Sequence, residues 1–391
     1  MDISIYFEPI IESDFQEINS DSKKIANFIK SYFKKNEFPH LEDIDIAIFG
    51  VKEDRNAVNN KGCALAPDII RKKLYNLFHP DYNIKIADLG NINKGYNIND
   101  TYFAVTDVIT NLLKKNIIPV IIGGSQDITF ANYKAYEKLK KTVNIIAVDS
   151  CLDIDENNNE LSSKSYLNKI ILQKPNYLFN YTNIGYQTYF TNPYTVKLMN
   201  NLLFDIYRLG HIRENIKETE PLVRNADILS FDISSVRQSD APGNSNASPN
   251  GFYGEEICQI IRYAGLSNKL SSIGFYEYNP EFDNKNQTAH LIAQMIWYFI
   301  DGFYNRKHDF PDKDNDDNFV KYIVTVNNDD YRIIFLKSKT TNRWWIDLRG
   351  NKKIKPKYKQ HYIIPCSHKD YQTACDGELP DRWWKAYQKL M

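Results

Sequence analysis

A short apolar run that ends in carboxylates lies near the middle of the chain: Val143-Asn-Ile-Ile-Ala-Val-Asp149-Ser150-Cys151-Leu152-Asp153. This pattern is typical of a buried strand of a parallel sheet whose carboxyl end reaches a functional site. If the strand continued, Asp149, Cys151 and Asp153 would alternate and point to one face. Two carboxylates and a thiol on one face predict either a metal site or the remains of one.

Two other apolar runs end in the same way. Ile117–Ile122 is followed by Gly123-Gly124-Ser125-Gln126, and Ala226–Phe231 is followed by Asp232-Ile-Ser234. Strands that alternate with helices predict an α/β domain with a mainly parallel sheet, whose site lies at the carboxyl ends of the strands. The other strands are expected over 44–50, 83–89, 177–185 and 270–276, and the helices over 67–78, 101–115, 128–140, 165–173, 193–208, 255–264 and 287–303.

The chain divides into three parts by composition. Residues 1–305 are expected to form the α/β domain, in which residues 1–43 are an N-terminal extension with a helix. Residues 306–318 are rich in Asp, Lys and Asn and predict an acidic linker. Residues 319–391 predict a small β-rich appendage, a β-meander followed by a short C-terminal helix.

The composition excludes several classes of partner. The 391 residues contain 49 Lys and Arg and 49 Asp and Glu, so long-range charge gives no reason to expect nucleic acid. No apolar run approaches the length of a membrane span, and the first residues lack the pattern of a signal peptide. The five cysteines are odd in number and scattered, which predicts reduced thiols and a cytoplasmic protein.

Seven ordered segments share one further pattern: Ile46–Gly50, Gly62–Arg71, Gly123–Gln126, Asp149–Asp153, Ser230–Ser234, Asp240–Gly243 and Glu277–Pro280. Taken together, these motifs resemble the ureohydrolase family, which includes arginase, agmatinase and formimidoylglutamase. The resemblance covers roughly residues 44–304 and implies a three-layer αβα arginase-like fold.

The resemblance also implies a site. The family binds two manganese ions through two His and four Asp, and the hydroxide between the ions attacks a guanidinium or amidine carbon. Amide, hydroxyl and thiol groups are poor replacements for these ligands, so we expect no family-type manganese pair and no cofactor. Only the three aspartates remain as possible metal ligands. The six corresponding positions in this chain are Gln126, Asp149, Cys151, Asp153, Asp232 and Ser234.

Three aspartates held close together need something that compensates their negative charge. Two bare carboxylates ~4 Å apart repel by about 4 kcal/mol at an effective dielectric constant near 20. A raised pKa, an inserted Lys or Arg, or one hard divalent cation would each relieve this repulsion. We place protonation or a basic partner ahead of a metal ion, and expect the purified protein to hold substoichiometric manganese.

Three of these positions each allow two interpretations. Cys151 could be a nucleophile, but no His lies near it in sequence, which favours an inert thiol. Gln126 could bind a ligand, or could satisfy neighbouring polar groups. By resemblance Glu277 would contact a substrate guanidinium, and the alternative is a structural pairing with an Arg.

The favoured interpretation at this point is a catalytically inactive relative that acts as a binding or scaffolding protein. Its β-rich appendage would pack on the α/β domain or recruit a protein partner, and a homo-oligomer is expected by resemblance. The competing hypothesis is a metal-dependent hydrolase of linear C–N bonds in guanidino or formimino compounds, with an altered metal site. A third is a sensor that binds such a metabolite without turnover.

Overall fold

A computed structural model describes residues 2–11, 22–34, 37–155, 160–312, 316–326, 331–349 and 356–391. Within these ranges ten strands form one sheet in the order β1-β4-β3-β5-β10-β9-β6-β7-β8, with β2 also paired to β4. Only the β1–β4 pair is antiparallel. The strands are β1 (Phe7–Glu8), β2 (Ile29–Ser31), β3 (Ile46–Val51), β4 (Ile86–Ile92), β5 (Ile118–Gly123), β6 (Val143–Val148), β7 (Leu178–Tyr186), β8 (Asp205–Arg208), β9 (Ile228–Asp232) and β10 (Ser272–Tyr276).

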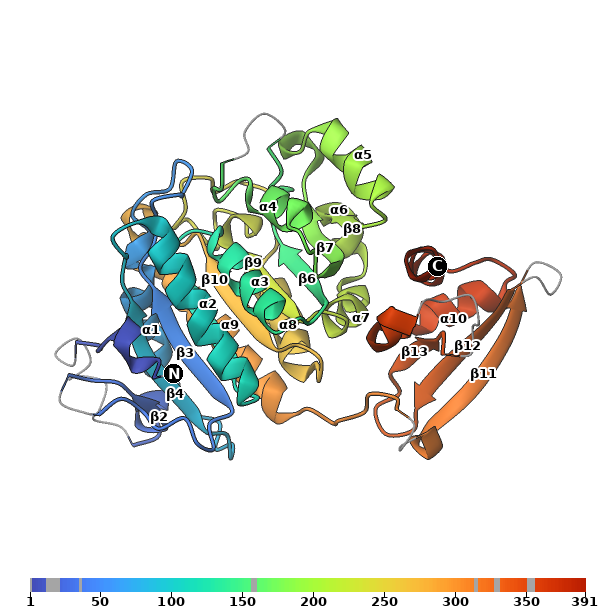
Figure 1. Cartoon of the computed structure of the whole chain (residues 1–391), viewed down its shortest axis with the longest axis horizontal. Helices are drawn as coiled ribbons and strands as arrows, with labels where there is room; N and C mark the ends of the chain where they lie inside the picture. The colour runs from blue at the N-terminus through green and yellow to red at the C-terminus, as the bar shows by residue number, and fades with distance from the viewer. Residues whose placement is uncertain are drawn as a thin grey trace.

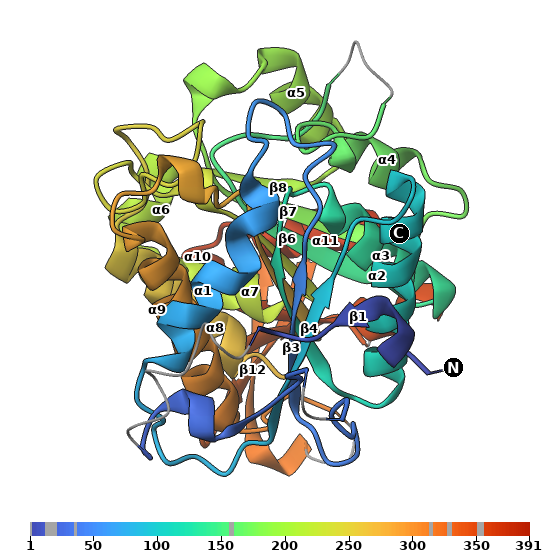
Figure 2. The same ribbon diagram turned by 90° about the vertical axis from the view of Figure 1, so that its left-hand side faces the viewer.

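Helices cover both faces of this sheet, which confirms the predicted three-layer α/β fold (Figure 1, Figure 2). One apolar cluster joins α1, α8 and α9 to one face, and a second joins α2, α3 and α4 to the other. None of the described helices has the length and apolar character needed to cross a membrane. The helices of the domain are α1 (Ala66–Tyr75), α2 (Ile98–Lys114), α3 (Ile128–Lys138), α4 (Tyr166–Leu172), α5 (Pro193–Asn201), α6 (Leu209–Glu214), α7 (Thr219–Arg224), α8 (Gly254–Leu266) and α9 (Gln287–Tyr304).

Two predicted helices are wrong. In the N-terminal extension, Ile25–Asn27 form a short 3-10 turn and Ile29–Ser31 form β2, because this segment pairs in parallel with β4. Residues 12–21, 35 and 36, part of the same prediction, lie outside the described residues. The helix expected over 193–208 ends at Asn201, and its second half is β8, which pairs with β7. Pairing to a sheet edge cannot be detected from local periodicity alone.

The C-terminal appendage is a four-stranded antiparallel sheet, β11 (Phe319–Val326), β12 (Tyr331–Ser338), β13 (Trp344–Asp347) and β14 (Ile363–Cys366). The meander was predicted, whereas β14 and the helix α10 (His368–Cys375) were not. The C-terminal helix was expected and is α11 (Asp381–Leu390). Trp344 and Trp383 lie in the apolar cluster between the sheet and these helices. Both are therefore core residues of the appendage.

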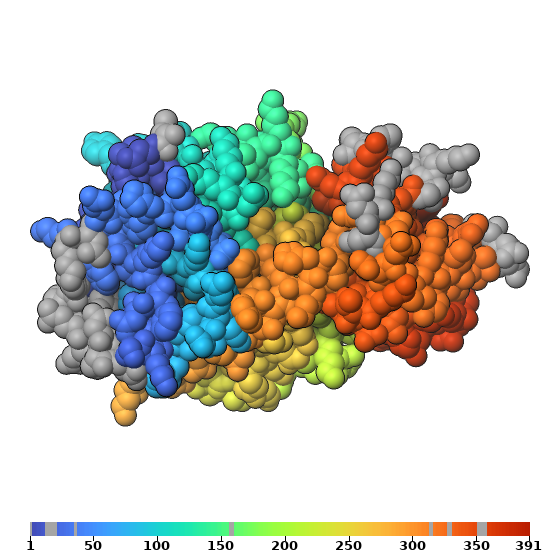
Figure 3. All heavy atoms as spheres, turned by 90° about the horizontal axis from the view of Figure 1, so that it is seen from below, coloured from blue at the N-terminus to red at the C-terminus, as the bar shows by residue number. Residues whose placement is uncertain are grey.

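The appendage packs against the α/β domain at one end of the molecule (Figure 3). Arg224, at the end of α7, is buried, and its guanidinium lies 4.4 Å from the ring centre of Trp345. Its Nη2 donates to the carbonyl oxygens of Trp344 at 3.1 Å and Cys366 at 3.2 Å. Lys385 of α11 forms an ion pair with Asp205 at 3.0 Å.

The interface gives a first prediction. Arg224→Ala should lower the free energy of unfolding by about 3 kcal/mol, because it removes a buried guanidinium and leaves its acceptors and Glu220 without that partner. Thermal unfolding and limited proteolysis of residues 306–312 would measure the loss of docking. Arg332→Ala, at an exposed position of the same appendage, is the control. Equal effects of the two substitutions would contradict this account of the interface.

Candidate functional site

Four neighbouring strands bring the polar positions together. In the sheet order β5-β10-β9-β6 all three pairings are parallel, so the carboxyl ends of these strands meet at one edge. Gln126, Asp149, Asp232 and Glu277 follow or end these strands, and each is at most 1% exposed. Parallel sheets place ligand sites at this edge, and the structure brings these predicted positions together there.

The backbone after β6 differs from the prediction. The strand ends at Val148, so Asp149, Cys151 and Asp153 lie in a loop rather than on one face of a strand. Asp149 Oδ1 accepts the N–H of Cys151 at 2.8 Å. On β9, Asp232 Oδ1 accepts the N–H of Ser234 at 2.7 Å in the same way. These turns fix one oxygen of each carboxyl group and leave Asp149 Oδ2 and Asp232 Oδ2 buried without a hydrogen-bond partner.

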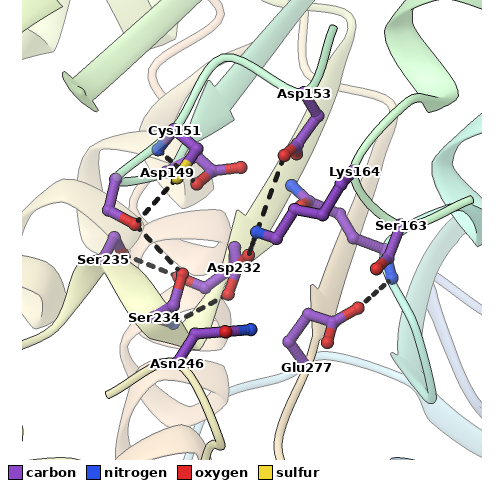
Figure 4. Close-up of polar contacts among 12 residues, drawn as sticks. Asp149, Cys151, Asp153, Ser163, Lys164, Asp232, Ser234, Ser235, Asn246 and Glu277 are labelled. Carbon is purple, nitrogen blue, oxygen red and sulfur yellow. Dashed lines mark hydrogen bonds and ion pairs between the residues drawn. The ribbon is translucent and has the colours of Figure 1, made fainter. Parts of the chain in front are cut away.

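A lysine enters this cluster of carboxylates. The Nζ of Lys164 lies 3.6 Å from Asp153 Oδ1 and 3.6 Å from Asp232 Oδ2 (Figure 4). Its side chain is 27% exposed, whereas the two carboxylates are at most 1% exposed. At an effective dielectric constant of 20, each pair attracts by about 5 kcal/mol before screening by solvent. A basic side chain thus lies among the aspartates, which is one of the three kinds of compensation considered from the sequence.

Burial and mutual repulsion raise the pKa of every acid here. Burial, and then the charge of Asp153, raises the pKa of Asp149 well above its usual value. Burial and the charge of Asp149 raise the pKa of Asp232 to about 6, against the opposing effect of Lys164. Burial alone favours the neutral amine of Lys164, but the surrounding carboxylates outweigh it and raise its pKa well above that of a free lysine. Lys164 is therefore a permanent cation rather than a nucleophile.

Glu277 is held by amide donors. Its Oε1 accepts the backbone N–H of Gln126 at 2.9 Å, and its Oε2 accepts Asn60 Nδ2 at 2.8 Å. These donors, and not an Arg, are its hydrogen-bond partners in the described part of the chain, while its contact with a substrate stays a prediction. Burial, and then the charge of Asp232, raises the pKa of Glu277 to about 8. Its φ of +66° is unusual for a side chain other than glycine, and such strain clusters at functional sites.

The remaining predicted positions are neutral. Gln126 Nε2 donates to Ser230 Oγ at 3.2 Å and to the Tyr166 hydroxyl at 3.4 Å, so it satisfies neighbouring groups. Burial raises the pKa of Cys151 to about 12, which keeps it a thiol and agrees with the inert interpretation. Ser234 Oγ lies 3.2 Å from Ser150 Oγ.

This donor set does not fit a pair of manganese ions. Two divalent ions require several charged or imidazole donors, whereas Gln126, Cys151 and Ser234 offer an amide, a protonated thiol and a hydroxyl. Lys164 already lies between two of the three aspartates. Throughout the described part of the chain, no three Asp, Glu, His or Cys side chains are grouped as a metal ion requires.

Two residues of the site were not foreseen from the sequence. Lys164 lies in the loop after Asp153, and Asn60 lies in the loop after β3, far from Glu277 in sequence. One signal was available for the lysine. It is the only cationic residue between Asp153 and α4, and the three aspartates needed a cation. Nothing in the sequence pairs Asn60 with Glu277.

Comparisons with known proteins agree on one family. The chain matches the arginase family over residues 44–301. A formimidoylglutamase from Staphylococcus aureus is 26% identical over 313 residues, which cover 75% of this chain and 98% of that protein. A formimidoylglutamase from Streptococcus gordonii is 24% identical and covers 66% of this chain and 84% of its own.

Solved structures show the same fold. The crystal structure of formimidoylglutamase from Bacillus subtilis has a TM-score of 0.64 at 20% identity and covers 73% of this chain and 92% of its own. The structure of Trypanosoma cruzi formiminoglutamase with Mn²⁺ has a TM-score of 0.65 at 20% identity and covers 73% of this chain and all of its own. A divalent metal thus accompanies this fold in a solved relative.

The favoured interpretation from the sequence, a catalytically inactive binding or scaffolding protein, is wrong. Its similar relatives carry the name of a hydrolase, and the match extends over nearly the whole length of the Staphylococcus aureus enzyme. The hydrolase of linear C–N bonds, held as the competing hypothesis, agrees better with these findings. The absence of the family's ligand types at Gln126, Cys151 and Ser234 does not by itself exclude hydrolysis.

The raised pKa of Glu277 gives a prediction for stability. The folded protein keeps a proton on Glu277 up to about pH 8, whereas the unfolded chain releases it near 4.5. The free energy of unfolding should therefore fall as pH rises through this window, and Glu277 alone should contribute a loss of about 2 kcal/mol between pH 6.5 and 8. Denaturant unfolding at several pH values would show a flatter profile for Glu277→Gln.

The control is Glu281→Gln, an exposed carboxylate on the 3-10 turn that follows. It should reproduce the profile of the unmodified protein. Parallel profiles for Glu277→Gln and the unmodified protein would show that Glu277 is ionised in the folded state.

Proposed function

Since the chain belongs to the arginase family, we propose that it hydrolyses a linear C–N bond in an amidine, a formimino or a guanidino compound. The observation that carries the proposal is the convergence of Asp149, Asp232 and Glu277 at the carboxyl edge of the sheet, as buried acids with raised pKa values. Acids and bases with pKa values moved toward neutrality are what proton transfer at neutral pH requires.

The charge of the cluster suits a cationic amidine. Four buried acids, Asp149, Asp153, Asp232 and Glu277, lie around the single ammonium of Lys164. With a pKa of about 6, Asp232 is mostly ionised near neutral pH, whereas Glu277, with a pKa of about 8, keeps its proton. A buried site in which the acidic groups outnumber the basic one favours an amidinium over an anionic group.

The pKa values assign the proton transfers. Asp232 Oδ2, which has no hydrogen-bond partner, accepts a proton from a water molecule while the oxygen of that water bonds to the amidine carbon. The C–N bond then breaks, and the departing nitrogen takes the proton of Asp149. The proton held by Asp232 returns to Asp149 and completes the cycle. These steps use only side chains of this chain, because the donor set does not fit a manganese pair.

Formimino compounds are the first substrates to examine, because the similar curated proteins are named formimidoylglutamases. We also propose a cytoplasmic setting, which the five free cysteines support. A homo-oligomer and a protein partner recruited by the appendage stay predictions. The contacts of Arg224 and Lys385 support packing of the appendage on the α/β domain.

The purified protein should release formamide, ammonia or urea from at least one of formimidoylglutamate, agmatine and arginine. Asp149→Asn should lower kcat by about 10²-fold or more, because the amide cannot protonate the departing nitrogen. Asp81→Asn is the control, since it changes an exposed carboxylate away from the site and asparagine tolerates its positive φ. Binding of these compounds without hydrolysis would favour a sensor and overturn the proposal.

The same assignment predicts a pH profile. Asp232 must lose its proton to act as the base, so kcat/KM should rise with pH through an apparent pKa of about 6. Asp232→Asn should abolish this dependence along with most of the activity. A rate that is constant between pH 5 and 7 would contradict the role of Asp232.

A further inference from the structure

Lys164 is held in place by its neighbours. The flanking Ser163 is buried, its N–H donates to the carbonyl oxygen of Asn56 at 3.0 Å, and its Oγ accepts the N–H of Val58 at 3.1 Å. Ser165, also buried, donates through Oγ to the carbonyl oxygen of Glu160 at 2.6 Å. The backbone on both sides of the lysine is therefore fixed, so its ammonium reaches the carboxylates from a preorganised loop.

The carboxylates that receive it have few other interactions. Both oxygens of Asp153 and Oδ2 of Asp232 are buried without a hydrogen-bond partner. An ion bound by both residues would have to lie between them, and the Nζ of Lys164 lies there, 3.6 Å from each (Figure 4). One place between two buried carboxylates cannot hold an ammonium and a divalent ion together, because their charges repel.

We propose that the Lys164 ammonium is the resident cation of this site and takes the position between Asp153 and Asp232 that a divalent ion would occupy. Amidine hydrolysis in this chain then proceeds without bound metal. The claim that hydrolysis proceeds without metal rests on the proposed function. The claim that Lys164 occupies the position between Asp153 and Asp232 does not. Lys164 is a positioning residue, because it holds the two carboxylates.

An ammonium in the place of metal ions has a chemical consequence for the attacking water. One ammonium carries a single positive charge, whereas two divalent ions carry four, and a nearby metal ion lowers the pKa of water far more strongly. Without that help the proton must be taken by a side chain. Oδ2 of Asp232 accepts no hydrogen bond and lies 3.6 Å from the ammonium, so it can act as that acceptor.

Metal content tests the inference independently of activity. The full-length protein, Lys164→Ala, Lys164→Arg and the control Lys169→Ala would be incubated with excess manganese at pH 8, desalted and analysed for metal. The unmodified protein, Lys164→Arg and Lys169→Ala should each hold less than ~0.1 ion per chain, with unfolding midpoints that manganese leaves unchanged. Lys164→Ala should bind about one ion and be stabilised by it.

The outcomes separate the two proposals. If the unmodified protein binds one or two ions in stoichiometric amount, or folded Lys164→Ala binds none, the occupancy of the position by Lys164 is refuted, whatever the activity. If the protein stays metal-free and hydrolyses an amidine at an unchanged rate with a chelator present, both proposals are supported. A metal-free protein that hydrolyses no amidine refutes the proposed function alone.

Discussion

The site depends on the attraction between one ammonium and a group of buried carboxylates. Asp149, Asp153 and Asp232 are each at most 2% exposed, and carboxylates taken from water at such close quarters cannot all ionise without a cation. Lys164 supplies that cation and keeps Asp153 and Asp232 in place. The same attraction limits the rise in the pKa of Asp232, so that this acid titrates within reach of neutral pH.

The scaffold makes this arrangement possible because parallel strands end at a common edge. The tips of β5, β10, β9 and β6 lie next to one another, and the loops that follow them turn sharply enough for Asp149 and Asp232 to accept backbone N–H groups. Helices on both faces exclude water from the sheet below. The carboxyl groups thus meet in a low-dielectric environment, which strengthens their repulsion and their attraction to Lys164.

Family membership and local chemistry carry different information here. The match over residues 44–301 and the named relatives support hydrolysis as the activity. The side chains at the tips of the strands decide how such chemistry can run, and Gln126, Cys151 and Ser234 offer no charged metal ligand. The appendage adds a separate apolar core, joined to the domain through Arg224.

The apolar strands and the motifs at their ends were sufficient to predict the α/β fold and the edge of the sheet at which the candidate residues meet, because burial imposes a periodic pattern on the chain. Contacts between residues far apart in the chain leave no such pattern in the sequence. β2 and β8 are strands because they pair with β4 and β7. The loop that carries Asp149 and Asp153 begins where β6 ends. Asp232 pairs with Lys164, and Glu277 pairs with Asn60; both partners come from loops that are distant in sequence. The cation that pairs with a buried carboxylate is the one that lies near it in space. Such residues come close together only when the sheet has assembled.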